Sequence, residues 1–86
     1  MTYNIISTED YAGSQELELI KNGDGYIIEL YNRETKECAR ISLKNIEQAI
    51  SIYKKFGDFM IRGHYSFEQR ANILKEERIR NEEFDD

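Results

Sequence analysis

Residues 15–32 read QELELIKNGDGYIIELYN, and this stretch decides the fold. Its first half alternates charged and apolar side chains from Glu16 to Leu19, which is the period of a β-strand with one buried face. Its second half, 26–32, is rich in the β-branched and aromatic residues that favour strands. Between them, 22–25 (NGDG) supplies residues that tolerate the positive φ of a tight turn. The stretch therefore predicts a β-hairpin.

The chain on either side of this hairpin predicts the rest of a small sheet. A polar connection leads into 38–41, which we interpret as a third strand, so that 15–42 forms a three-stranded antiparallel β-meander. In the N-terminal segment 1–14, residues 2–7 include the strand formers Tyr3, Ile5 and Ile6 and are expected to form a short edge strand. Residues 8–14 lack periodicity and are expected to form a loop.

After the meander the apolar period changes to that of a helix. Apolar side chains over 43–56 recur on one face, with Ile50 at its centre, and predict an amphipathic helix packed on the sheet. Ser42 is suited to cap the start of this helix and Gly57 to end it. We expect 58–65 to be a connector that carries a short apolar patch.

A second helix is predicted over 66–84. Ser66 and Gln69 are spaced as a capping box, in which each side chain accepts a hydrogen bond from the backbone of the other. Only the first turns carry an apolar stripe, so we expect this helix to be partly exposed, acidic and frayed at its end. Together these elements predict one α+β domain over 1–86.

Composition limits the function as well as the fold. The 86 residues carry a net charge of −5 and suit a single small core, without a cofactor domain beside a substrate domain. No apolar run approaches the roughly 20 residues of a membrane span, and the first residues lack a signal-peptide pattern. The single cysteine, Cys38, excludes an intrachain disulfide framework and suits a reducing cytoplasm. We therefore expect a cytoplasmic protein without a membrane partner.

Three features suggest chemistry, and each has a simpler interpretation. The turn resembles the centre of an EF-hand calcium loop, but Ile20 and Tyr31 occupy positions that require oxygen ligands, so we expect a plain turn. His64 is a potential general base, but a lone histidine of this kind is more typical of an exposed loop. Cys38 is a potential nucleophile beside Arg40, yet no histidine is expected near it. With no metal-ligand spacing, phosphate loop or nucleophile elbow, we expect no enzyme, no cofactor and no metal.

The face of the predicted sheet that points away from the core combines apolar and acidic side chains. Ile27, Glu29 and Tyr31 share this face, and Glu16 and Glu18 join them from the neighbouring strand. Aromatic sheet faces can stack bases, but these carboxylates would repel phosphates, so we expect no direct binding of nucleic acid. Two alternatives are open: the second helix covers this face, or the face binds a protein.

The C-terminal stretch 75–86 is strongly acidic. Its carboxylates belong to Glu76, Glu77, Glu82, Glu83, Asp85 and Asp86. On one interpretation they form a solvated helix end that aids solubility. On the other they occupy the positions of phosphates and attract a basic partner, such as the nucleic-acid groove of an enzyme.

The order of elements, three strands followed by a packed helix and an acidic last helix, resembles the small anti-CRISPR proteins of phages. The resemblance covers Glu16–Leu74 and includes the amphipathic run 45–53 (NIEQAISIY). It implies inhibition of a nuclease by acidic loops and helix edges that imitate DNA. Segment 58–65 departs from that pattern, because Arg62 and His64 stand where acids would be expected.

We therefore expect a small acidic, non-enzymatic protein that binds and inhibits a basic nucleic-acid-handling protein of phage or mobile-element type. The expected partner-binding residues are the six C-terminal acids together with Glu16, Glu18, Ile27 and Tyr31. The alternative is a regulatory protein-interaction module, or a homodimer, whose negative charge is incidental. The salt dependence of binding distinguishes these two interpretations, because screening weakens charge-driven binding and leaves apolar association largely unchanged.

Overall fold

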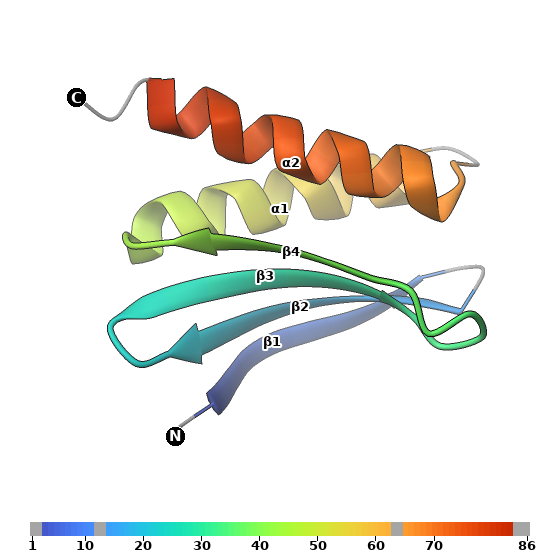
Figure 1. Cartoon of the computed structure of the whole chain (residues 1–86), viewed down its shortest axis with the longest axis horizontal. Coiled ribbons are helices and arrows are strands. Elements are labelled where there is room, and N and C mark those ends of the chain that lie inside the picture. Colours follow the sequence, from blue (N-terminus) through green and yellow to red (C-terminus); the bar gives the residue numbers. More distant parts are fainter. Residues whose placement is uncertain (1–2, 12–13, 63–64, 84–86) are drawn as a thin grey trace.

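The computed structural model describes residues 3–11, 14–62 and 65–83 of the chain. Within them the elements follow in the order β1 (Tyr3–Tyr11), β2 (Gln15–Asn22), β3 (Gly25–Asn32), β4 (Cys38–Leu43), α1 (Ile46–Arg62) and α2 (Phe67–Glu83). The strands form one antiparallel sheet in the order β1-β2-β3-β4, and both helices lie above it in Figure 1. The predicted α+β class and antiparallel meander are confirmed. The predicted number of strands is wrong, because the sheet has four.

The fourth strand is β1, which was expected as a short edge strand over 2–7 and continues to Tyr11 through residues that were expected to form a loop. It pairs with β2 along its whole length, and the pairing shifts at Ile6, which is an extra residue in the ladder. Such a bulge exchanges the faces that the following residues occupy. Ser7 and Glu9 consequently lie opposite the two buried leucines of β2, and the hydroxyl groups of Ser7 and Tyr53 hydrogen-bond at 3.1 Å.

The predicted hairpin between β2 and β3 is confirmed. Asn22 pairs with Gly25, which leaves a two-residue turn of Gly23 and Asp24. Gly23 has a φ of 59°, whereas the φ of Asp24 is not positive. A positive φ at the first central position alone is the pattern of type II′ turns, which favour glycine there.

Helix α1 begins and ends later than the predicted 43–56. Leu43 is the last residue of β4, and Ser42 is a strand residue rather than a cap. The cap is Asn45, whose Oδ1 accepts hydrogen bonds from the backbone N–H groups of Glu47 at 2.8 Å and Gln48 at 3.3 Å. These bonds satisfy N–H groups that have no partner within the helix.

The C-terminal half of α1 replaces the first part of the predicted connector. Gly57 lies buried inside the helix instead of ending it, and the helix continues to Arg62. A Cβ atom at Gly57 would lie 3.0 Å from the hydroxyl oxygen of Tyr11, so the glycine provides room for a side chain of β1. The reason for a glycine at this position is therefore a long-range contact, and not the end of a helix.

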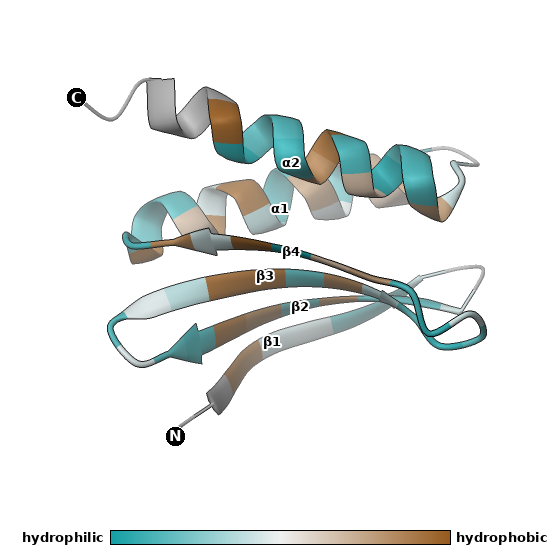
Figure 2. Cartoon of the chain, viewed as in Figure 1, coloured by the Kyte–Doolittle hydropathy of each residue, from teal (hydrophilic) through white to brown (hydrophobic). Residues whose placement is uncertain are grey.

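The core lies between α1, α2 and one face of the sheet. Figure 2 shows hydrophobic residues along the strands and on α1, and mostly hydrophilic residues along α2. The strand residues in this core are Leu17, Leu19, Ile28, Leu30, Ala39, Ile41 and Leu43. On α1 the buried stripe is Ala49, Ile52, Tyr53, Phe56, Gly57 and Met60. Ile50, which was predicted to be its centre, is 38% exposed, because the longer helix buries a stripe that is rotated toward Ile52.

Helix α2 begins with the predicted capping box. The backbone N–H of Gln69 donates to Ser66 Oγ at 3.2 Å, and the backbone N–H of Ser66 donates to Gln69 Oε1 at 3.0 Å. The helix packs against β4 and α1 through Ala71 and Leu74, which are buried. After Leu74 its described side chains are exposed or half-buried.

Candidate functional site

The candidate site is the face of the sheet that points away from the core, which we call the outer face. Its residues alternate with the buried core residues of the same strands. The strand register arranges them in three rows, which are Ile5–Ile20–Ile27–Ser42, Thr8–Glu18–Glu29–Arg40 and Asp10–Glu16–Tyr31–Cys38. The four residues predicted for this face, Glu16, Glu18, Ile27 and Tyr31, thus lie on neighbouring positions of β2 and β3.

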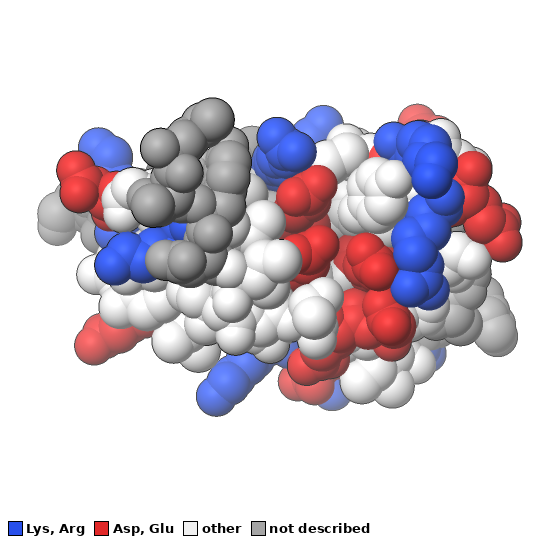
Figure 3. Space-filling model, turned by 90° about the horizontal axis from the view of Figure 1, so that it is seen from below, with Lys and Arg blue, Asp and Glu red and all other residues white. Residues whose placement is uncertain are grey.

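Acidic side chains dominate one region of this side of the molecule. Figure 3, which views the molecule from below, shows them gathered near its middle, with uncharged surface on one side of them and a band of basic side chains to their right. Helix α2 contacts β4 and α1, so it lies at the opposite edge of the sheet from β1 and leaves most of the outer face uncovered. Of the two alternatives from the sequence, the structure therefore favours an accessible face.

The middle row sets two carboxylates against each other. Glu18 and Glu29 are direct cross-strand partners, an arrangement that is unfavourable for like charges. Glu29 has a cation nearby, since Arg40 Nη2 lies 3.5 Å from its Oε1. Glu18 has no ion pair or hydrogen bond from its side chain among the described residues. Burial, followed by the charges of Glu29 and Glu16, raises the pKa of Glu18 above its ordinary value.

Both acids of the third row have an ion-pair partner, and they share it. Arg33, in the connection between β3 and β4, places its Nη1 atom 3.0 Å from Glu16 Oε1 and 3.4 Å from Asp10 Oδ1. One guanidinium therefore links the connection to both β1 and β2. Tyr31 lies beside Glu16 in this row and is half-buried. Of the outer-face acids in these rows, Glu18 is thus the one without an ion-pair partner among the described residues.

The first row forms an apolar corner beside these acids. Ile5 is 62% exposed, whereas its cross-strand partner Ile20 is 8% exposed and is covered by its neighbours. A hollow of about 270 Å³ joins this corner to the middle row. Its lining residues are Ile5, Glu18, Ile20, Ile27, Glu29 and Arg40.

Ile5 and Ile20 were missed as site residues by the sequence analysis. The alternation of 16–19 already contained a signal for Ile20, because it places Ile20 on the same face as Glu16 and Glu18. Ile5 had no comparable signal. Its position depends on the pairing of β1 with β2 and on the bulge at Ile6.

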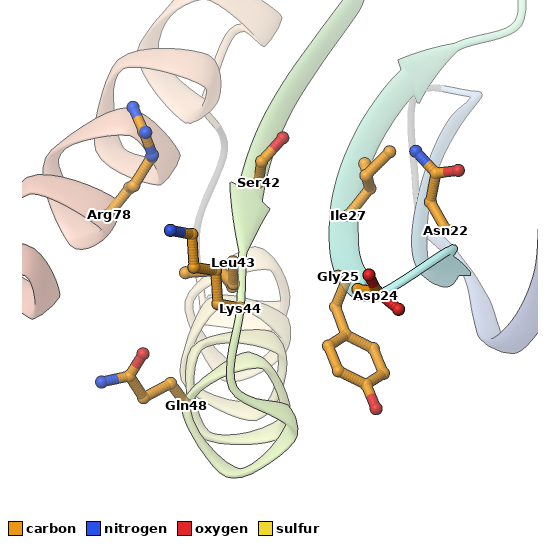
Figure 4. Close-up of a pocket in the computed structure, with 10 residues that line it drawn as sticks. Asn22, Asp24, Gly25, Ile27, Ser42, Leu43, Lys44, Gln48 and Arg78 are labelled. Carbon is orange, nitrogen blue, oxygen red and sulfur yellow. The ribbon is translucent and has the colours of Figure 1, made fainter.

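A larger hollow, of about 580 Å³, lies between the β2–β3 turn, the start of α1 and α2. Figure 4 shows Lys44, Gln48 and Arg78 on one side of it and Asp24 on the other. In that view their polar ends point in different directions. Ligand sites usually combine an apolar pocket with a few polar groups that converge on one point, and this hollow has no such convergence among its lining residues.

The groups that suggested chemistry have the following surroundings. Cys38 is exposed, and its Sγ donates a hydrogen bond to Glu29 Oε1 at 2.9 Å. Burial and this carboxylate raise the pKa of the Cys38 thiol, although Arg40 acts in the opposite direction, so the reactive thiolate is disfavoured. His64 lies outside the described residues. Among the residues that are described, no group of three or more His, Cys, Asp or Glu side chains is placed to hold a metal ion.

Of the C-terminal acids, the structure describes the side chains of Glu76 and Glu77. Glu76 is exposed and Glu77 is half-buried on α2, and neither lines the outer-face hollow. Glu82 and Glu83 belong to the last turn of α2, whereas Asp85 and Asp86 lie outside the described residues. Among the described side chains, the C-terminal acids Glu76 and Glu77 therefore do not share the hollow of the outer face.

Comparison with protein-family models, with curated proteins and with solved structures found no match for this chain. In the described part of the chain, neither helix combines the length and the apolar character that crossing a membrane requires. The argument for function consequently rests on the geometry and electrostatics of the outer face.

Proposed function

We propose that this chain is a non-enzymatic binding protein whose outer face docks a basic surface of another protein. The observation that carries the proposal is Glu18, a carboxylate that lies opposite Glu29, has no ion-pair partner among the described residues and adjoins exposed apolar surface at Ile5. A partner that presents lysine or arginine together with apolar side chains would compensate this charge and bury the isoleucine corner. Complementarity of this kind gives specificity and speeds association.

A partner of different composition fits this face better than a second copy. In a two-fold symmetric dimer the same patch meets itself, so the acidic rows of two copies would lie against each other. The net charge of −5 adds a repulsion between copies. The outer face therefore favours a heterologous, basic partner.

The finer proposal is that the partner handles nucleic acid and is inhibited when this protein binds. Its support is that basic surface patches are the electrostatic footprint of nucleic-acid-binding proteins, so a protein that covers such a patch competes with DNA or RNA. The resemblance to anti-CRISPR proteins in the order of elements points in the same direction. The single exposed thiol of Cys38 supports a cytoplasmic setting.

Selection of random peptides displayed on a surface, with the full chain as the immobilised target, tests the proposal. We expect the selected peptides to be enriched in lysine or arginine next to apolar residues. Glu18→Lys should weaken their binding by about tenfold or more, since it places a cation where the partner's cation is expected. Glu47→Lys, which makes the same change of charge at an exposed position on α1, is the matched control and should have little effect.

Two results would contradict the proposal. One is a selection without enrichment of basic residues. The other is an equal loss of binding in Glu18→Lys and Glu47→Lys, which would assign the effect to net charge and not to the outer face. The more specific proposal, that the partner binds nucleic acid and is inhibited, requires in addition that DNA or RNA competes with this protein for its natural partner.

A further inference from the structure

The hollow on the outer face has dimensions that suit one protruding side chain. Its volume is about 270 Å³, whereas sites for small molecules typically enclose roughly 300–1,000 Å³ and bury most of the ligand. The hollow lies on an accessible sheet face, where a partner surface can approach it. A long side chain of a docked protein would fill it more readily than a free small molecule would.

One wall of the hollow is apolar and continuous. Ile5, Ile20 and Ile27 occupy the same cross-strand row on β1, β2 and β3, where neighbouring Cβ atoms lie about 4.5–5.5 Å apart. Ile20 is nearly buried and forms the floor, whereas Ile5 is exposed and forms the rim. A chain of methylene groups that lay across this row would bury apolar surface on both partners.

The other wall carries an uncompensated negative charge. Glu18 and Glu29 contribute two carboxylates, against the one guanidinium of Arg40. The carboxylate of Glu29 is engaged by Arg40 at 3.5 Å and by the thiol of Cys38 at 2.9 Å. The carboxylate of Glu18 has no such partner among the described residues. The hollow therefore lacks one positive charge, and Glu18 marks where it is missing.

We infer that this hollow receives a single lysine or arginine side chain of the partner, with its methylene stem against the isoleucine row and its charged end at Glu18. Lysine and arginine commonly bury their stems along apolar surface in this way while the charged end stays paired. The inference rests on the proposed function and adds to it which chemical group is recognised and where. The raised pKa of Glu18 is in keeping with it, since a cation placed there would relieve the penalty on the ionised carboxylate.

The test uses the full ¹⁵N-labelled chain and three capped amino acids as probes. These are the N-acetyl methylamides of lysine, of arginine and of norleucine, the last being an uncharged analogue of lysine with a similar stem. We expect saturable amide shifts with the lysine or arginine probe at Glu18, Ile20, Ile27 and Glu29, and weaker shifts with norleucine. Glu18→Gln should reduce the affinity by about tenfold, as for a lost charge-assisted hydrogen bond, and Glu47→Gln should not.

Three results would overturn the inference that the hollow receives a basic side chain. They are equal shifts for all three probes, shifts spread over the surface, or an affinity that Glu18→Gln leaves unchanged. Ile5→Ser provides a second variant at an exposed position, and it should weaken the lysine probe by removing the rim of the apolar wall. If the inference fails, the proposed function is still tested separately by the peptide selection. Basic peptides can bind the outer face without placing a side chain in the hollow.

Discussion

Replacing Gly57 with alanine adds a methyl carbon that would lie 3.0 Å from the hydroxyl oxygen of Tyr11. Attractive contacts between non-bonded heavy atoms are optimal near 3.5–4.0 Å, so α1 or β1 would have to move by a few tenths of an ångström. The hydroxyl of Tyr11 also donates a hydrogen bond of 2.7 Å to Glu9 Oε2, which restrains where it can go. The substitution thus tests the contact between β1 and α1.

Two effects of opposite sign determine the expected magnitude. Within a helix, alanine is more favourable than glycine by about 1 kcal/mol. Overpacking a contact typically costs about 1–3 kcal/mol. We therefore expect Gly57→Ala to lower the free energy of unfolding by about 1 kcal/mol in the natural chain. In a Tyr11→Phe background, which removes the hydroxyl, the same change should raise it by about 0.5–1 kcal/mol, as an unopposed helix propensity does.

Equilibrium denaturation in urea of the four chains in this double-mutant cycle measures both numbers. An equal loss of stability in the two backgrounds would mean that Gly57 ends the helix, as its sequence suggested, because a helix-ending glycine with positive φ disfavours alanine regardless of Tyr11. An equal gain in both would mean that the two residues are not in contact. Either result would refute the described docking of β1 against α1.

The other predictions concern the core, the outer face and the turn. Ile52→Ala should cost about 2–4 kcal/mol in urea denaturation, whereas Ile50→Ala, at a position that is 38% exposed, should cost clearly less; the reverse order would mean a misassigned helix face. Glu18→Gln should make the chain more stable than the natural one at pH 7. The raised pKa means that the folded chain penalises the ionised carboxylate, so this gain should shrink as the pH falls through the carboxyl range, and a gain independent of pH would contradict it. The turn at 22–25 should bind no calcium in calorimetric titration, since its flanks are strands; micromolar affinity would disprove this.

The local parts of the fold could be predicted from the sequence because their signals are local. The hairpin follows from alternation and a glycine-containing turn, and the second helix begins at a capping box that the structure contains. Two of the errors involve residues that are distant in the chain. The alternation of β1 is interrupted by the bulge at Ile6 and becomes visible only through its pairing with β2. The glycine inside α1 is explained only by a tyrosine 46 positions earlier in the chain.

On the outer face, too, the local features could be predicted from the sequence and the long-range ones could not. The period of two along β2 and β3 placed Glu16, Glu18, Ile27 and Tyr31 on one face, because a strand alternates its side chains regardless of the fold around it. That Glu18 lies directly opposite Glu29 depends on the hairpin register, and that Ile5 adjoins them depends on β1. The hollow therefore could not be derived from any one segment.

The outer face also shows why an unfavourable pair is retained. A cross-strand pair typically changes stability by about 0.2–1 kcal/mol, whereas burying one leucine contributes about 1.5–3 kcal/mol. A slip of β2 by one residue would move Leu17 and Leu19 out of the core, so the leucines fix the register and Glu18 must lie opposite Glu29. Nothing in this register requires an acid at position 18, since a neutral polar residue would alternate equally well. Positions that break a local rule without a structural need are where functional residues are expected. On this argument the outer face, more than the acids of α2, is where a basic partner would gain most by binding.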